Sequence, residues 1–213
     1  GNRLKGVPRR DMAEQAKLTK ECLFKGLHLP DMRAIKLLAS LKDRKDDTIM
    51  LALVEELRKE GIAVLDQTQY LKTLMPPAGV LTRQRPTAEE EKDIAFGFEA
   101  AKRIGGMDLG QTVVVKHLAV MAVEAIEGTD ACTRRGGALA RGGAVVVKTA
   151  KPGQDSRFDV PAVGMDTLKA MEESGCRVLA VEAERTILAE KEELLKEADR
   201  RHIVIAAGGR DHD

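Results

Sequence analysis

The chain has 213 residues, 43% of them hydrophobic, and a formal net charge of +1 at pH 7. This hydrophobic content allows a sizeable core and excludes global disorder, and the length suits one large domain or two small ones. The near balance of charge argues against a broad nucleic-acid-binding surface. With no Trp and one Tyr, few rings are present on which single-stranded bases could stack.

The three cysteines, Cys22, Cys132 and Cys176, lie far apart and form no CxxC pair or other metal-ligand spacing. We expect them to be reduced and buried in a cytoplasmic protein. No apolar run approaches the roughly 18 residues of a membrane span. The polar, basic segment at the start of the chain does not resemble a signal peptide.

Two helices and a strand are predicted in the first part of the chain. Asp31–Leu41 follows a proline and has the pattern of a short helix. Asp46–Glu60 repeats apolar residues every four positions, and Gly61 should end it. Ile62–Leu65 then has the composition of a brief strand. Leu74–Arg85, which contains two prolines and a glycine, is the best linker candidate.

Helices and strands alternate in the second half. Thr87 precedes three glutamates, which predicts a capped helix that runs to about Ile104. Gln111–Lys116 and Ala119–Glu124 have the pattern of a hairpin. The later predictions are a helix at Thr129–Ala140 that Gly136–Gly137 weakens, a strand at Gly143–Thr149, a helix at Thr167–Glu173, a strand at Val178–Val181, a helix at Glu190–Arg201 and a strand at Ile203–Ala206. The order predicts a mixed α/β domain.

Polar residues gather in three loops. The first, Glu124–Asp130, follows a predicted strand, and Thr129 could cap the next helix and expose its N–H groups to a phosphate. Gly128 would allow close approach of the backbone. Its three carboxylates, Glu124, Glu127 and Asp130, could bind a divalent cation. A plain capped helix with solvated acids is the alternative.

The second loop, Arg134–Gly143, combines arginines with glycines. Guanidinium groups match phosphate geometry, so this stretch could clamp an anion. A simple connection from helix to strand is the alternative. No P-loop motif is present, so a nucleoside triphosphate site of that type is not predicted.

The third loop, Lys148–Pro161, contains Lys148, Lys151, Asp155, Arg157 and Asp159. If Asp155–Asp159 is extended, alternation places both aspartates and the arginine on one face. Such a group could hold Mg²⁺ and a phosphate, because Mg²⁺ uses one or two carboxylates with water and substrate oxygens. A surface loop held by salt bridges is the alternative.

The same loops carry a family resemblance. The segments are LKDRKDDTI (Leu41–Ile49), PPAGVLTRQRPT (Pro76–Thr87), DLGQTVVVK (Asp108–Lys116), AVEAIEGTDA (Ala122–Ala131), RRGGALA (Arg134–Ala140), GAVVVKTAKPGQDSRFDVPAVG (Gly143–Gly164) and VLAVEAERTIL (Val178–Leu188). Together they resemble the LpxI-type UDP-2,3-diacylglucosamine pyrophosphatases, over roughly Lys17–Ala206. The combination of EGTDA with KPxQDxRxDxP is specific.

The resemblance implies a Mg²⁺-dependent hydrolase of lipid A biosynthesis in a Gram-negative bacterium. It would cleave the pyrophosphate of UDP-2,3-diacylglucosamine to UMP and 2,3-diacylglucosamine 1-phosphate (lipid X), through attack of water and no covalent enzyme intermediate. It also implies two domains that enclose the site and move against each other. We expect an α/β fold with a truncated Rossmann-like part at 1–77 and a mixed α/β catalytic domain at 78–213. The expected location is the cytoplasm, with peripheral contact to the inner membrane; a homodimer and no nucleic-acid partner are also expected.

We assign roles to the motif residues on this resemblance. Asp155, Asp159 and Asp130 are the predicted catalytic residues. The predicted metal ligands are Asp155, Asp130 and Glu124, with Glu127 a weaker candidate. The predicted substrate-binding residues are Gly128, Thr129, Lys148, Lys151, Gln154 and Arg157. Phe96, Phe98 and Met165 could line an acyl-chain cleft, with core packing as the alternative.

The chain departs from the family pattern at three places. Family members begin with a strand and a glycine-rich turn upstream of the position that matches Lys17, whereas only Gly1–Ala16 precedes it here. A truncated N-terminal domain is therefore expected. Glu184 stands where the family has glycine, and Glu190 where it has aspartate. The alternative to an active hydrolase is a non-catalytic module that binds a nucleotide sugar, a lipid or another protein.

Overall fold

The computed structural model describes residues 36, 37, 39, 41 and 46–209. The chain forms two compact units, Gly1–Ala63 and Val64–Asp213. The helix predicted at Asp31–Leu41 lies mostly outside the described residues, and residues 36, 37 and 39 within it are helical. Cys22 also lies outside them.

Helix α3 covers Asp46–Lys59 in the first unit, which confirms that prediction. It ends where Gly61 adopts φ +75°, a left-handed conformation that glycine takes without steric cost. The predicted strand at Ile62–Leu65 is wrong, because these residues are irregular, with Ile62 53% and Leu65 60% exposed. Apolar residues form a strand where a neighbour pairs with them, and no described strand pairs with this segment.

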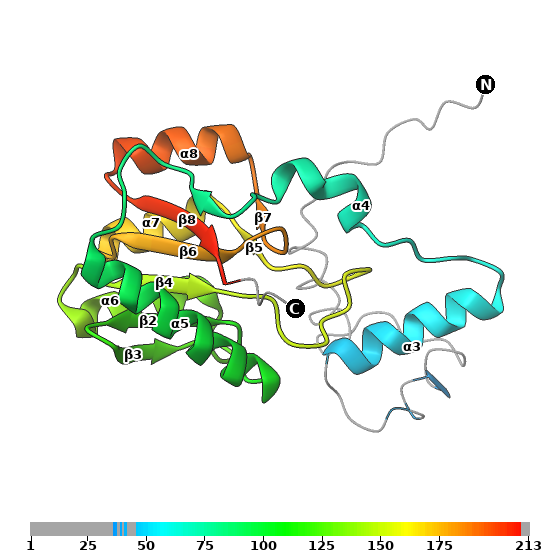
Figure 1. Ribbon diagram of the computed structural model, residues 1–213. Helices are drawn as coiled ribbons and strands as arrows, with labels where there is room; N and C mark the ends of the chain where they lie inside the picture. Colours follow the sequence, from blue (N-terminus) through cyan, green and yellow to red (C-terminus); the bar gives the residue numbers. More distant parts are fainter. Residues whose placement is uncertain (1–35, 38, 40, 42–45, 210–213) are drawn as a thin grey trace. The chain divides into compact units, whose positions relative to one another are not determined.

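The second unit is built on a mixed six-stranded sheet. The strands are β1 (Gly79–Val80), β2 (Thr112–Lys116), β3 (Ala119–Val123), β4 (Val145–Lys148), β6 (Val178–Glu182) and β8 (Val204–Gly208), in the order β1-β8-β6-β4-β2-β3 (Figure 1). Strands β4, β6 and β8 are parallel, whereas β1 and β2–β3 are antiparallel to their neighbours. β5 (Ala162–Val163) and β7 (Ile187–Leu188) form a separate parallel pair that the sequence did not predict.

Helices cover both faces of this sheet (Figure 1). They are α5 (Ala88–Gly106), α6 (Thr129–Ala140), α7 (Met165–Ser174) and α8 (Lys191–Arg200), preceded by the short α4 (Thr68–Leu71) and the 3₁₀ helix η1 (Lys72–Leu74). Phe98 and Ala101 of α5 pack on one face, and helices α6, α7 and α8 pack on the other. This arrangement confirms the predicted mixed α/β class.

The core explains why the strand sequences are continuously apolar. Val113, Val145 and Val147 point toward α5, whereas Val114 and Val146 point toward the opposite helices. Strands covered on both faces bury every side chain, so their sequences do not alternate. Among the candidate cleft residues, Phe98 is buried in the core, and Phe96 and Met165 pack against it. In the described part of the chain, no helix combines the length and hydropathy needed to cross a membrane.

Helix α5 begins at the predicted cap. The Thr87 hydroxyl accepts a bond from the Glu90 amide at 3.2 Å, and the Glu90 carboxylate accepts one from the Thr87 amide at 2.7 Å. These reciprocal bonds form a capping box, which satisfies N–H groups that no helical carbonyl can reach. Arg177 adds an ion pair to Glu90 at 2.7 Å, which ties this end of the helix to the start of β6.

The segment predicted as a linker, Leu74–Arg85, contributes an edge strand. Within it, Gly79 pairs with Ala207 and Val80 with Ala206, and the Leu81 amide donates to the Ile205 carbonyl at 2.9 Å. The linker prediction is therefore wrong for β1. Prolines lack the N–H group that an inner strand needs, but an edge strand tolerates them nearby.

The glycine-rich stretch Arg134–Gly143 is mostly helical. Gly136 and Gly137 lie within α6, where a Cβ atom would approach Val114 Cβ to 2.4 Å and Ser174 Cβ to 2.5 Å. The glycines therefore permit close packing of α6 on β2 and α7. Two of its three arginines form ion pairs, Arg134 with Glu173 at 2.6 Å and Arg135 with Glu127. These contacts favour the structural reading of this stretch over an anion clamp.

Candidate active site

One edge of the sheet collects the polar loops. Because β4, β6 and β8 are parallel, their carboxyl ends meet there, and antiparallel β2 places Thr112 beside Lys148. Residues 149–161 leave β4 at this edge, and residues 183–186 leave β6. Open α/β sheets bind ligands at the carboxyl ends of their strands.

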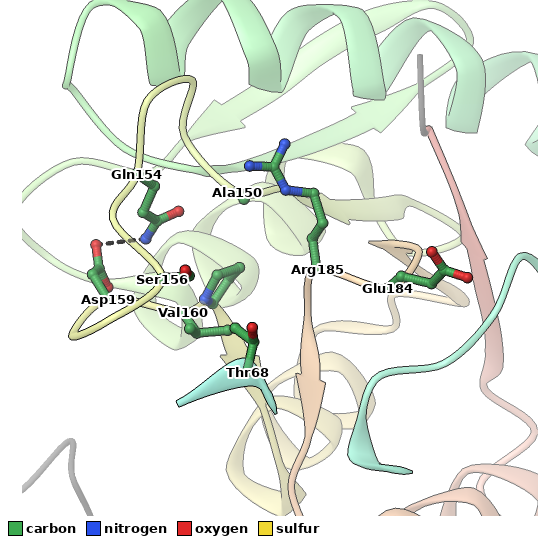
Figure 2. Close-up of a pocket in the computed structure, with 9 residues that line it drawn as sticks. Thr68, Ala150, Gln154, Ser156, Asp159, Val160, Glu184 and Arg185 are labelled. Carbon is green, nitrogen blue, oxygen red and sulfur yellow. Dashed lines mark hydrogen bonds between the residues drawn. The ribbon is translucent and has the colours of Figure 1, made fainter. Parts of the chain in front are cut away.

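A cavity of about 230 Å³ opens at this edge (Figure 2). Its lining residues are Thr68, Ala150, Gln154, Ser156, Asp159, Val160, Pro161, Glu184 and Arg185. Two of the predicted site residues therefore line it, Gln154 and Asp159, and the Gln154 amide donates to the Asp159 carboxylate. Figure 2 shows this pair on one side of the cavity and Arg185, from the turn after β6, on the other.

Glu124, Thr129 and Lys148 form a buried network beside the loop after β4. The Lys148 ammonium donates to the Thr129 hydroxyl and to the Ala162 carbonyl, both at 2.9 Å. The Thr129 hydroxyl donates to Glu124 Oε1 at 2.9 Å. Lys148 is 6% exposed and Glu124 8% exposed, so both charges are shielded from water.

Burial governs the electrostatics of Lys148. It lowers the pKa of the ammonium, because removing a charge from water costs free energy, and the nearby carboxylates of Glu124, Asp130 and Asp159 oppose that shift. Lys148 thus has carboxylates from the first and the third predicted loop around it. Asp130 itself accepts a bond from the Thr167 hydroxyl at 3.0 Å.

Thr129 does not cap α6 as expected. The N-cap residue is Gly128, at φ +82°, and no side chain caps the helix. The Thr129 hydroxyl instead joins Lys148 to Glu124. The left-handed φ of Gly128 explains the glycine at this position, because a side chain there would strain the backbone.

Asp155–Asp159 forms a turn and not an extended segment. The amides of Phe158 and Asp159 donate to the Asp155 carbonyl at 3.2 and 3.0 Å, so the expected alternation onto one face is wrong. The Asp155 carboxylate pairs with Arg157 at 2.6 Å. Bonds from the Arg157 guanidinium lower the pKa of Asp155, so its side chain is ionised at neutral pH.

The other predicted residues have partners nearby. Lys151 pairs with Asp108 at 2.8 Å, and its amide donates to Gln154 Oε1 at 2.8 Å. Glu127 pairs with Arg135 on the surface. Lys151 therefore orders the loop that carries Gln154, whereas Glu127 stays outside the network around Lys148.

The predicted metal ligands do not come together as one set of carboxylates. Glu124 binds Thr129, Asp130 binds Thr167 and Asp155 binds Arg157. Across residues 46–209, no group of three or more His, Cys, Asp or Glu side chains is arranged to hold a metal ion. A metal ion bound among the described residues would therefore take most of its ligands from water and substrate.

Three charged residues at the carboxyl ends of the strands, Lys102, Glu182 and Arg185, were not predicted as site residues from the sequence. Glu182 is the last residue of β6 and is 2% exposed. Its carboxylate forms an ion pair with Lys102 of α5 at 2.7 Å. Arg185 follows in the turn and lines the cavity. The signal was present, because an apolar run that ends in charged residues marks the carboxyl end of a buried strand.

The fold is an open-sheet α/β domain with a polar cavity at the carboxyl ends of its parallel strands, the place where such sheets bind ligands. Comparison with known families narrows this class. The LpxI C-terminal domain matches residues 77–206 and the LpxI N-terminal domain matches residues 16–74, so the chain belongs to the LpxI family.

One relative is a UDP-2,3-diacylglucosamine pyrophosphatase LpxI from Caulobacter vibrioides (strain ATCC 19089 / CIP 103742 / CB 15). The two chains are 34% identical over 182 residues, which are 80% of this chain and 65% of the relative. The chain thus spans just under two thirds of that relative's length. All cavity-lining residues except Thr68 fall within the matched C-terminal domain.

Proposed function

We propose that this chain hydrolyses the pyrophosphate bond of UDP-2,3-diacylglucosamine to UMP and 2,3-diacylglucosamine 1-phosphate. The observation that carries the proposal is the coincidence of the LpxI C-terminal domain with a polar cavity at the carboxyl edge of the sheet. Water adds to one phosphorus, and the bridging oxygen leaves with the other phosphate. Such a reaction needs cations beside the phosphoryl oxygens and a positioned water.

The residues of the two loops have separate roles in this proposal. Asp155, ionised at neutral pH, and Asp159, in the cavity wall, are the groups that would orient the attacking water. Gln154 fixes Asp159, and Arg157 fixes Asp155. Lys148 holds Thr129 at the N-terminus of α6, where helix N–H groups favour a phosphate.

Mg²⁺ is the proposed cofactor. Because the described carboxylates do not form a ready-made set of ligands, the ion would take water and phosphoryl oxygens together with one or two carboxylates. It would supply charge neutralisation on the pyrophosphate. Loss of UMP release in EDTA, restored by added Mg²⁺, would support this requirement; full activity in EDTA would remove it.

A steady-state assay of UMP release tests the reaction itself. Asp155→Ala and Asp159→Ala should each lower kcat by about 100-fold or more, the scale expected when a group that positions a proton transfer is lost. Asp166→Ala, on the exposed start of α7, is the matched control and should leave kcat unchanged. Near-normal kcat in Asp155→Ala would remove Asp155 from the site. Absence of UMP from the wild-type reaction, with UDP still bound, would favour the non-catalytic binding module.

A further inference from the structure

Strand β6 ends in a buried carboxylate, Glu182, that lies near two cationic side chains. Glu182, 2% exposed, accepts bonds from Lys102 Nζ at 2.7 and 2.8 Å and from the Ala150 amide at 2.8 Å. Arg185 Nη1 lies farther away, 3.4 Å from Glu182 Oε1. The Glu182 carboxylate thus has two cationic partners, of which Lys102 is the closer. Glu182, Lys102 and Arg185 together carry a formal charge of +1.

The second cation is the one that faces the cavity. Arg185 lines it and its side chain is 47% exposed, whereas that of Lys102 is 22% exposed. In Figure 2 the Arg185 side chain extends toward Ala150, and the Glu184 carboxylate points away from the side that holds Gln154. Among the described residues the guanidinium contacts Glu182 through one nitrogen, Nη1, so its other N–H groups can donate to a ligand.

The fold holds this turn without help from the Arg185 side chain. The Ala183 amide donates to the Gly208 carbonyl at 3.0 Å, the Glu184 amide to Pro76 at 2.8 Å and the Thr186 amide to Glu182 at 3.2 Å. Backbone bonds to two other segments, at Gly208 and Pro76, and one bond within the turn therefore fix the position of the Arg185 backbone. A cationic side chain on a turn that backbone bonds hold in place, next to a cavity, is suited to bind a ligand.

We propose that Arg185 is a substrate-binding residue that contacts phosphoryl oxygens of the pyrophosphate, and that Glu182 is a positioning residue for it. This inference rests on the proposed function for the identity of the substrate. A guanidinium group donates two parallel bonds to a phosphate, which a lysine cannot do. Lys102 balances the Glu182 carboxylate, so that Glu182 orients Arg185 without cancelling its charge.

Titration with UDP, with and without Mg²⁺, tests the binding role in the full chain. Arg185→Ala should weaken UDP binding about tenfold to a hundredfold, the range for a lost hydrogen bond to a charged group. Arg185→Lys should bind UDP with intermediate affinity. Arg103→Ala is the matched control, because Arg103 is an exposed arginine of α5 paired only with Glu99 among the described residues, and it should match the wild type. Equal UDP affinity in Arg185→Ala and wild type, or no UDP binding by the wild type, overturns the inference.

Measurement of UMP release distinguishes failure of this inference from failure of the proposed function. A wild-type chain that releases no UMP removes the proposed reaction, and the UDP titration still decides the role of Arg185. A wild-type chain that releases UMP, with KM and kcat unchanged in Arg185→Ala, overturns the inference alone.

A double-mutant cycle tests Glu182. If Glu182 acts through Arg185, Glu182→Gln should weaken UDP binding in the wild type but add little to Arg185→Ala, because coupled residues are not additive. Additive losses would overturn the positioning role. If Glu182→Gln does not fold, Glu182→Gln with Lys102→Met removes both the buried carboxylate and its partly buried partner and serves in its place.

Discussion

Glu184 lies in a backbone conformation that suits glycine. Its φ is +56°, and it is the third residue of a turn in which the Arg185 amide donates to the Glu182 carbonyl at 3.4 Å. Turns with a positive φ at this position favour glycine. The positive φ of Glu184 gives a physical reason for the glycine that the family resemblance leads us to expect at this position.

We expect Glu184→Gly to stabilise the protein by about 1 kcal/mol, because a left-handed residue with a Cβ atom costs about that much. Chemical denaturation would measure the change. Glu184→Gln keeps the Cβ atom and removes the charge, so it separates the backbone effect from electrostatics. An equal gain in Glu184→Gln would show that charge, and not conformation, is responsible.

Cys132 is a buried thiol whose proton is hard to remove. It is 0% exposed, and burial raises the pKa of the thiol from 9.0 to about 12. The thiolate is the reactive form, so Cys132 should be inert in the native protein. The structure also confirms the prediction that Cys132 and Cys176 are buried.

The free energy of unfolding should therefore depend on pH through Cys132. Below pH 9 both states keep the proton; between pH 9 and 12 only the unfolded state loses it, so stability falls as pH rises. The slope from this group is at most about 1.4 kcal/mol per pH unit. We expect the wild type to lose stability faster than Cys132→Ala across this window, measured by urea denaturation. Identical slopes would contradict the raised pKa.

Helix α6 depends on glycines for its packing. A Cβ atom on Gly136 would lie 2.4 Å from Val114 Cβ, closer than two non-bonded carbon atoms can approach. Gly136→Ala should therefore lower the free energy of unfolding by about 1–3 kcal/mol through overpacking, although alanine is the better helix former.

Gly106, at the end of α5, provides the matched control. A Cβ atom there would meet only Pro152 Cγ, at 4.0 Å, an ordinary contact. Gly106→Ala should leave stability unchanged or slightly raised, measured by the same thermal denaturation as Gly136→Ala. If both variants lost the same stability, backbone conformation and not packing would be the cause.

Helices and strands were predicted correctly where the signal lies within a few residues of them. Predictions failed where contacts between residues distant in sequence determine the structure. The Thr87 cap and the hairpin turn at His117–Leu118 lie within a few residues of the structure they specify, and both predictions are confirmed. The Gly136–Gly137 pair was interpreted as a weakness of the helix, because nothing local shows that Val114 packs against it. β1 was missed for the same reason, since its partner β8 lies at the other end of the domain.

The sequence predicted which loops form the candidate site but not the contacts between its side chains. The motif predicted the loops that contain Lys148, Gln154 and Asp159, and Gln154 and Asp159 line the cavity. It could not predict that Asp155 would bond to Arg157 in a turn. The ion pair of Lys102 with the buried Glu182 joins a helix to a distant strand, so only the fold brings the two residues together.

At the scale of the whole molecule, the second unit contains the core and the cavity. Every strand pair and both hydrophobic clusters of the described residues lie within Val64–Asp213. A domain with its own core folds as a cooperative unit. We therefore expect a chain that begins at Val64 to unfold in one transition, with a midpoint within about 4 °C of the full chain, because about 1 kcal/mol shifts the midpoint by 2–4 °C at this size. Differential scanning calorimetry would measure it. A broad, non-cooperative transition would show that residues before Val64 are required for the fold of the domain that carries the site.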